Sequence, residues 1–132
     1  MATEATDEQG RTPLHLAALR EPVERVRQLL DEGANVDAAD RQGFTALHLA
    51  GLKNRDDVAE VLLEAGASVD PVDGWGDTPL FRAVFNAGGE PALVHRLVDA
   101  GADPDRQNEH GVSPRKLAET IGSVDTATYF CP

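Results

Sequence analysis

The sequence predicts an all-α repeat protein, because two short motifs recur in phase along most of its length. The first motif reads TPLHLA at residues 12–17, TALHLA at 45–50, TPLFRA at 78–83 and, more weakly, SPRKLA at 113–118. The second reads GANVD from Gly33, GASVD from Gly66 and GADPD from Gly101. Two independent motifs with a shared spacing indicate stacked structural modules rather than one conventional core.

Each module is expected to hold a turn and two helices, as residues 7–39 illustrate. The turn is predicted at Asp7–Gly10, where an aspartate precedes polar residues and a glycine tolerates positive φ. Thr12 is a suitable N-cap, and Pro13 suits the first helical position. A second helix is predicted through residues 23–30, where Val and Leu recur at steps of three and four. Gly33 follows its last turn, as expected of a C-terminal glycine.

The same pattern divides the chain into an N-terminal tail of residues 1–6 and four modules, at about 7–39, 40–72, 73–107 and 108–132. A helix pair of this size cannot bury its apolar stripes alone, whereas stacked copies can. The fourth module is truncated, and residues 129–131 stand where its second helix would lie. Cys131 falls at a core position there, which favours a buried, unreactive thiol.

The turn DxxG, followed by TPLHLA, VxxLL and GA-x-V-D at a period of 33 residues, resembles the ankyrin repeat. The resemblance covers about residues 7–132. It implies a solenoid of stacked antiparallel helix pairs with projecting β-hairpin or turn loops, here called fingers. Fingers and first helices would line a concave face. It also implies that His15 and His48 are structural, with hydrogen bonds to the finger and helix turns.

The chain departs from the ankyrin pattern at several positions. Arg82 and Arg115 replace leucines that are normally buried, and Glu119 replaces an alanine. The loop at residues 87–91 holds two extra residues, which accounts for the longer step before the fourth module. Because stacking would place the first helices of modules three and four side by side, Arg82 and Glu119 could form a buried ion pair. They could instead form a polar pocket beside Asp77.

Composition and charge limit the classes of function. The 132 residues include 23 acidic and 12 basic ones, for a net charge of −11, which disfavours nucleic-acid binding. No apolar run approaches the roughly 20 residues of a membrane helix, so no membrane partner is expected. The N-terminal residues lack the features of a signal peptide, and one cysteine cannot form an internal disulfide. These observations predict a cytoplasmic protein, and ten arginines against two lysines suggest a bacterial one.

The sequence contains no recognised catalytic or phosphate-binding motif, so no catalytic residue and no cofactor are expected. Asp99, Asp103 and Asp105 superficially resemble a calcium loop. That loop would need Gly where Asn108 stands and Glu where Pro114 stands, so no metal site is expected either.

The resemblance places the residues least constrained by the fold at the finger tips and at the end of each first helix. The candidate partner-binding residues at these positions are Arg11, Leu19, Arg20, Arg41, Phe44, Leu52, Lys53, Trp75, Asp77, Phe85, Asn86, His110 and Ile121.

Two patterns stand out among these candidates. An apolar stripe is expected from Leu19, Phe44, Leu52, Trp75 and Phe85. Exposed aromatic clusters mark interfaces, although curvature could partly bury these side chains. A basic group is expected on modules one and two from Arg11, Arg20, Arg41 and Lys53, unless these are plain solvated charges. Together they predict a ligand with an apolar anchor and an acidic end that lies over modules one and two. The expected protein is a monomer that binds another protein through this face.

Two other interpretations stay open. The first is an enzyme or small-molecule binder that uses the groove of modules three and four. Its candidate residues are Asp77, Arg82, His110, Glu119 and a wall of Trp75 and Phe85. The second is a self-associating structural unit, which predicts a dimer that buries Phe44 and Trp75.

Overall fold

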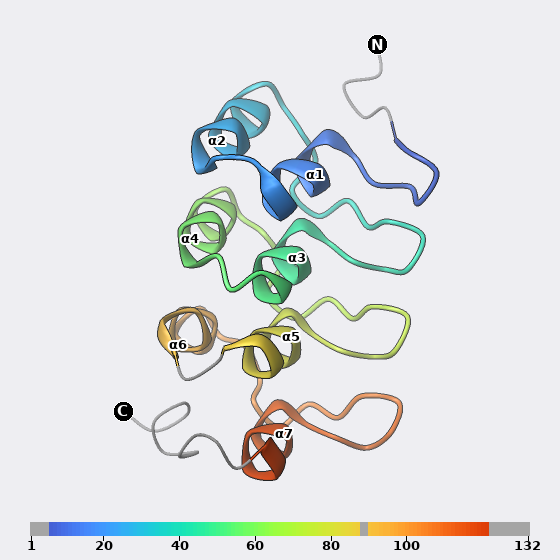
Figure 1. The fold of residues 1–132 in the computed structure, drawn as a ribbon, viewed down its shortest axis with the longest axis vertical. Helices are drawn as coiled ribbons and strands as arrows, with labels where there is room; N and C mark the ends of the chain where they lie inside the picture. Colours follow the sequence, from blue (N-terminus) through green and yellow to red (C-terminus); the bar gives the residue numbers. More distant parts are fainter. Residues whose placement is uncertain (1–5, 88–89, 122–132) are drawn as a thin grey trace.

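The computed structural model describes residues 6–87 and 90–121 as a row of stacked layers (Figure 1). The first three layers are the pairs α1 (Pro13–Arg20) with α2 (Val23–Asp31), α3 (Ala46–Leu52) with α4 (Asp56–Glu64), and α5 (Pro79–Asn86) with α6 (Ala92–Asp99). The fourth layer contributes α7 (Pro114–Ile121). The expectations for Cys131 and for the end of module four lie outside the described residues.

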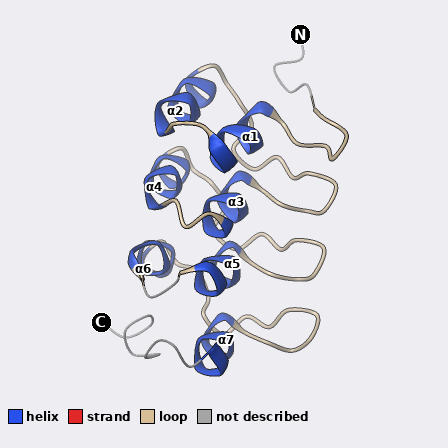
Figure 2. Cartoon of the chain, in the orientation of Figure 1, coloured by secondary structure: helices blue, strands red, loops and turns tan. Residues whose placement is uncertain are grey.

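The first helices α1, α3, α5 and α7 form one column, and α2, α4 and α6 form a second column beside it (Figure 1). The fingers project from the first column, on the side away from the second (Figure 2). The described part of the chain contains no β-strand. Each finger is closed by a tight turn. Its backbone hydrogen bonds, such as the one from the N–H of Asp40 to the carbonyl oxygen of Phe44, are too few to form a strand ladder.

Every finger is built on the same turn, which one side chain holds in shape. The Oδ1 atom of Asp7, Asp40, Asp73 or Asn108 accepts two backbone N–H groups of its own finger, at 2.9–3.0 Å. The glycine three residues later has φ between 75° and 83° in all four fingers, a conformation that favours glycine. The turn therefore presents the second residue after the aspartate or asparagine at each tip.

Neighbouring fingers are joined by single backbone hydrogen bonds. The N–H groups of Arg41, Gly74 and Glu109 donate to carbonyl oxygens of the preceding finger, at 2.9, 2.7 and 3.1 Å. The fingers thus form a continuous row along one side of the molecule.

Two buried histidines fasten the first helices to the fingers. The backbone N–H of Thr12 donates to Nδ1 of His15 at 3.0 Å, so this nitrogen is an acceptor and the proton lies on Nε2. Nε2 then donates to the carbonyl oxygen of Phe44 at 2.7 Å. His48 repeats the arrangement with Thr45 and with the carbonyl oxygen of Asp77. The structural role expected for both histidines is confirmed.

The core lies between the layers and is drawn from both columns. Leu14, Leu47 and Leu80 recur at the same place in successive first helices and are all fully buried. Helices α3 and α5 approach closely at Gly51, where a Cβ atom would lie 2.9 Å from the carbonyl oxygen of Pro79. This close packing fixes α5 against module two and so positions the residues of the candidate site.

Candidate functional site

A groove of about 550 Å³ opens between α5, α7 and the fingers of modules two to four. The surface of its lining is mainly apolar and aromatic, although six of the eleven lining residues have polar side chains. The lining residues are Phe44, Trp75, Asp77, Phe81, Arg82, Asn108, His110, Val112, Lys116, Leu117 and Thr120. A concave surface of this size and character is the usual form of a binding site.

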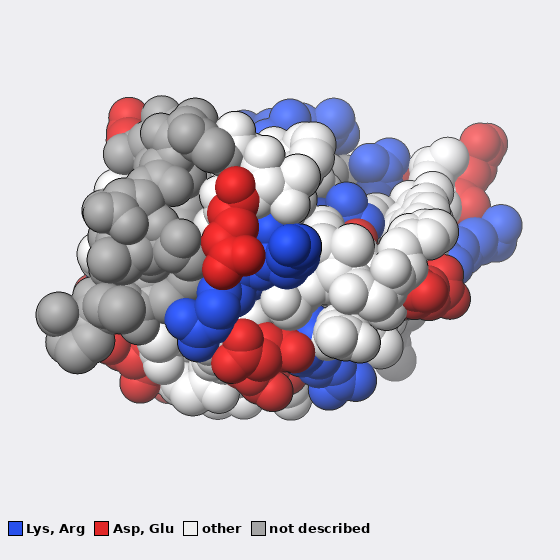
Figure 3. Space-filling model, turned by 90° about the horizontal axis from the view of Figure 1, so that it is seen from below, with Lys and Arg blue, Asp and Glu red and all other residues white. Residues whose placement is uncertain are grey.

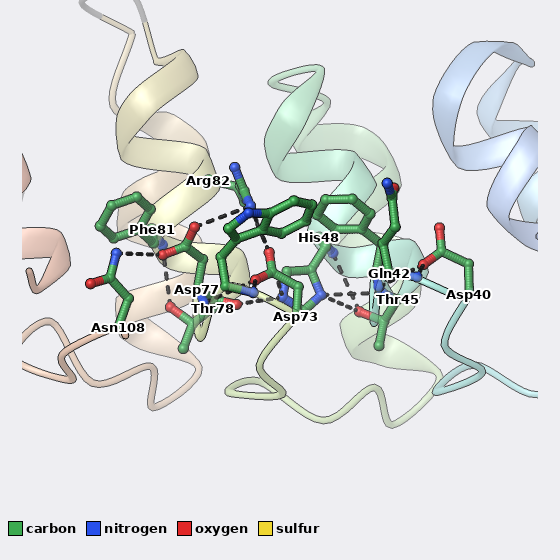
Figure 4. Close-up of polar contacts among 12 residues, drawn as sticks. Asp40, Gln42, Thr45, His48, Asp73, Asp77, Thr78, Phe81, Arg82 and Asn108 are labelled. Carbon is green, nitrogen blue, oxygen red and sulfur yellow. Dashed lines mark hydrogen bonds and ion pairs between the residues drawn. The ribbon is translucent and has the colours of Figure 1, made fainter. Parts of the chain in front are cut away.

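Arg82 and two aspartates form the polar centre of this groove (Figure 4). Nε and Nη2 of Arg82 donate to Oδ2 of Asp73, at 3.1 and 2.9 Å. Nη2 also lies 3.1 Å from Oδ2 of Asp77. The other carboxylate oxygen of Asp77 accepts a hydrogen bond from the side-chain amide of Asn108 at 2.8 Å. The guanidinium is therefore held in one orientation from below.

Two aromatic rings flank the same guanidinium. The rings of Phe44 and Trp75 have centroids 5.8 Å apart, and Cζ of Arg82 lies 5.2 Å from the first and 5.5 Å from the second. Both distances fall within the range of a cation–π interaction. Phe44 also meets the ring of His48 edge-on at 5.8 Å. The aromatic wall and the charged centre thus form one packed unit.

The charges of the site are layered by depth. The side chain of Asp73 is 0% exposed and that of Asp77 is 7% exposed, whereas that of Arg82 is 20% exposed. Lys116 and His110 are exposed at the rim. The exposed charge of the groove is therefore mainly cationic, on Lys116 and in part on Arg82, and the carboxylates lie beneath it.

His48 lies next to this centre and is uncharged at neutral pH. Burial of its ring lowers the pKa of His48 below the usual value, although its hydrogen bond to Asp77 and the nearby carboxylate of Asp73 act in the opposite direction. The neutral ring keeps Nδ1 as the acceptor of the backbone N–H of Thr45, while Nε2 donates to the carbonyl oxygen of Asp77 and holds the third finger over α3.

The expected ion pair between Arg82 and Glu119 is wrong. Arg82 pairs with Asp73 and Asp77, both in the finger of its own module. Glu119 is exposed and does not line the groove. The reason is that the third finger folds back over the start of α5, which brings Asp73 within hydrogen-bonding distance of a residue nine positions later.

The apolar stripe is divided into buried and exposed parts. Leu19, Phe44 and Leu52 are half-buried and pack against the core. Trp75 is 43% exposed and Phe85 is 63% exposed. Phe85 lies at the end of α5 and does not line the groove. Ile121 is exposed at the end of α7.

The basic candidates are also unequal. Arg11 forms an ion pair with Asp7 at 2.9 Å, within the first finger. Arg20, Arg41 and Lys53 are exposed. Asn86, at the end of α5, donates a hydrogen bond to the carbonyl oxygen of Arg82 at 2.8 Å. Seen from the end formed by the fourth module, basic and acidic side chains lie intermingled rather than in one patch (Figure 3).

Three important residues were not among the sequence candidates. Asp73 supplies the main partner of Arg82, Phe81 lines the groove, and Lys116 stands at its rim. The sequence did carry a signal for the last two, because Phe81 and Lys116 occupy the position of His15 and His48 in the earlier modules. Loss of that histidine removes the tie between helix and finger, so these positions are free for another role.

Comparison with known families identifies the architecture. A family model described as "Ankyrin repeats (3 copies)" matches residues 2–73, and a second one, "Ankyrin repeat", matches residues 75–109. A comparison with curated proteins gives no match. Among the described helices, none is long and apolar enough to cross a membrane. Because the first model alone matches more than half of the sequence, the chain belongs to the ankyrin-repeat family.

Proposed function

We propose that this protein binds a partner protein through its concave face, with the groove of modules two to four at the centre of the contact. Ankyrin repeats are in general protein–protein interaction modules, which supports the class of function. The observation that carries the proposal is the exposed indole of Trp75 at the mouth of the groove. Tryptophan is a preferred energetic anchor of interfaces.

The fold does not require an aromatic residue at this position. The corresponding residue is Gln9, Gln42 or His110 in the other fingers, all of them exposed. Phe85 likewise corresponds to Thr120 in the fourth module. A large ring that stays 43% exposed where the other fingers carry polar residues is best explained by a contact outside the molecule, in addition to its packing on Arg82.

The proposed mode of action is occupancy of the partner rather than catalysis. Two charged side chains of the groove, Arg82 and Asp77, are engaged in holding its shape, since Arg82 is bound to Asp73 and Asp77, and Asp77 to Asn108. A protein of this kind would act in the cytoplasm as an adaptor, inhibitor, immunity or accessory protein, and as a monomer until it meets its partner.

Substitutions borrowed from the other modules test the proposal without disturbing the fold. Trp75→Gln and Phe85→Thr, combined in one variant, introduce residues that the chain already carries at the same places. Val72→Gln is the matched control, because Val72 is also exposed and Gln107 occupies its place in the next module. Affinity capture from the host lysate would identify the partner, and calorimetry with the purified partner would give the Kd.

We expect the double variant to bind at least about thirtyfold more weakly, as loss of a central hot spot does. The control should bind like the wild type. Equal binding by the wild type and the double variant would move the interface off this face.

The two alternative functions, small-molecule binding and self-association, would give different experimental results. The groove volume of about 550 Å³ also suits a small molecule, which would protect the protein thermally in a metabolite screen and leave no captured partner. Self-association would appear in sedimentation as a concentration-dependent dimer, abolished in the double variant.

A further inference from the structure

We propose that the groove selects a partner segment in which an aromatic or branched apolar side chain stands next to an acidic one. The apolar side chain would pack on the rings, and Arg82 with Lys116 would bind the carboxylate. The inference rests on the proposed function and adds the chemistry of the partner.

The rings of the groove already hold a cation, which argues against a cationic ligand. Arg82 lies over the rings of Phe44 and Trp75 and neutralises Asp73 and Asp77 beneath them. A ligand ammonium or guanidinium on the exposed part of Trp75 would be repelled by Arg82, and one that went deeper would have to displace Arg82. Displacement would leave two buried carboxylates without their cation, which is strongly unfavourable.

Arg82 is bound on one side only and retains free donors. Its Nε and Nη2 atoms are engaged by the two aspartates, whereas Nη1 has no hydrogen-bond partner within the described residues. The ammonium group of Lys116, on the opposite wall, has no ion-pair partner there either. A carboxylate in the groove would thus find a cationic donor on either of two lining residues, and charge-assisted hydrogen bonds are the strong ones.

The guanidinium is also ordered before any ligand arrives. Two carboxylate contacts and two rings hold it in place, so little side-chain entropy remains to be lost on binding. Asp77 lies close to the same group and would repel a ligand carboxylate. The charges of Asp73, Asp77, Arg82 and Lys116 sum to zero, however, so the site as a whole does not oppose an anion.

The groove also has an apolar part, which favours an apolar neighbour for the carboxylate. Phe81, Val112 and Leu117 line this part, in addition to the rings of Phe44 and Trp75. These side chains cannot donate a hydrogen bond to a ligand. A ligand segment with acidic side chains alone would therefore leave this apolar surface without a packing partner. The pairing of an apolar with an acidic side chain is the composition that uses both halves of the site.

The net charge of −11 repels an acidic partner at a distance, so the attraction between the partner's carboxylate and the groove acts only at short range. At physiological ionic strength charges beyond about 8 Å are largely screened, so the distant acidic surface does not override contacts inside the groove. An acidic partner would associate without electrostatic acceleration and gain its selectivity after contact.

The single tryptophan of the chain, Trp75, allows a direct test. Three capped peptides serve as probes: Gly-Glu-Phe-Glu-Gly, its isosteric amide Gly-Gln-Phe-Gln-Gly, and the basic Gly-Lys-Phe-Lys-Gly. None contains tryptophan, so emission from Trp75 reports binding in the groove. Each peptide is titrated to about 5 mM, which covers the weak affinities of short ligands.

We expect the acidic peptide to bind about tenfold more tightly than its amide, the size of one charge-assisted hydrogen bond. The Lys116→Gln variant should lose most of this preference while it still responds to phenylalanine. So should the double variant Arg82→Leu with Asp73→Asn, in which the asparagine retains the finger turn as Asn108 does. If the double variant does not fold, Lys116→Gln decides the question, because Lys116 is exposed at the rim.

Three results would overturn the inference. They are equal binding of the acidic and amide peptides, tighter binding of the basic peptide, and no change in Trp75 emission with any of them. None of these touches the broader proposal, which fails only if the captured partner binds independently of Trp75 and Phe85.

Discussion

Arg82 occupies a position that holds leucine in the other three modules, and its neighbours have adapted to its charge. Restoring that leucine is expected to destabilise the protein, because Asp73 would remain buried without a cation. We expect Arg82→Leu to lower the free energy of unfolding by about 3 kcal/mol, the usual effect of breaking a buried pair. Urea denaturation measures the change.

A second variant separates charge from packing. Adding Asp73→Asn to Arg82→Leu should recover part of the lost stability, because asparagine forms the same turn in the fourth finger, while Asp77 stays buried without the cation. Glu119→Ala should leave the stability within about 0.5 kcal/mol of the wild type, as expected of an exposed side chain. A large loss from Glu119→Ala would restore the pairing that the structure contradicts.

His48 should make stability depend on pH. Its pKa is lowered in the folded protein by burial, whereas the unfolded imidazole takes up a proton near its usual value of about 6.5. The unfolded state therefore binds more protons, and the free energy of unfolding falls as the pH falls below about 6.5, by at most about 1.4 kcal/mol per pH unit. An NMR titration of the imidazole follows the group itself. A midpoint at or above the unfolded value would contradict this prediction.

The same residues mark what the sequence could and could not predict about the site. It identified Trp75, Phe44, Asp77 and His110 as candidates, because the repeat shows which positions the fold leaves free. It missed Asp73. Asp7 and Asp40 occupy the same position in the first and second fingers and form the turns there, so Asp73 looked purely structural. The repeat already accounts for an aspartate at this position, because it forms the turn. Its second role, as the partner of Arg82, therefore could not be predicted from the repeat.

The helices follow closely from local sequence. Threonine caps start α1, α3 and α5, and Pro13 and Pro79 occupy first-turn positions. The predicted helical fold is confirmed. It could be predicted because caps and first-turn prolines act within a few residues of the helix start. The path of each finger is less predictable, since it depends on contacts with the next module, such as the bond between His48 and the carbonyl oxygen of Asp77.

Gly51 sets the distance between α3 and α5. A methyl group there would lie 2.9 Å from the carbonyl oxygen of Pro79, which is too close for any side chain. We expect Gly51→Ala to destabilise the protein by about 1–3 kcal/mol through overpacking, although alanine is the better helix former.

Ala18 occupies in α1 the position that Gly51 occupies in α3, so the opposite substitution, Ala18→Gly, can be made there. Ala18→Gly should cost about 1 kcal/mol through helix propensity and about 0.8 kcal/mol more through loss of a buried methyl group. Thermal unfolding of both variants compares the two effects. A stabilised Gly51→Ala would show that α5 can move away without loss, and Arg82 would be free to move with it.

The whole molecule carries a large excess of negative charge, and stacking brings these charges together. With a net charge of −11, mutual repulsion should weaken the folded state at low ionic strength. We expect the Tm to rise by several degrees between about 10 mM and 300 mM salt, as the screening length falls from about 30 Å to less than 10 Å. Scanning calorimetry measures the rise. A falling Tm would mean that ion pairs such as Arg96 with Asp56 outweigh the repulsion.

The row of fingers has a consequence for how the array opens. Each junction between neighbouring fingers is bridged by one amide proton, that of Arg41, Gly74 or Glu109. Such a proton exchanges with solvent deuterium only when its own junction separates. The three exchange rates would therefore measure three separate opening equilibria, one for each seam of the molecule. The seams at Gly74 and Glu109 border the groove, so slowing at these two amides alone would locate a bound partner without any substitution in the chain.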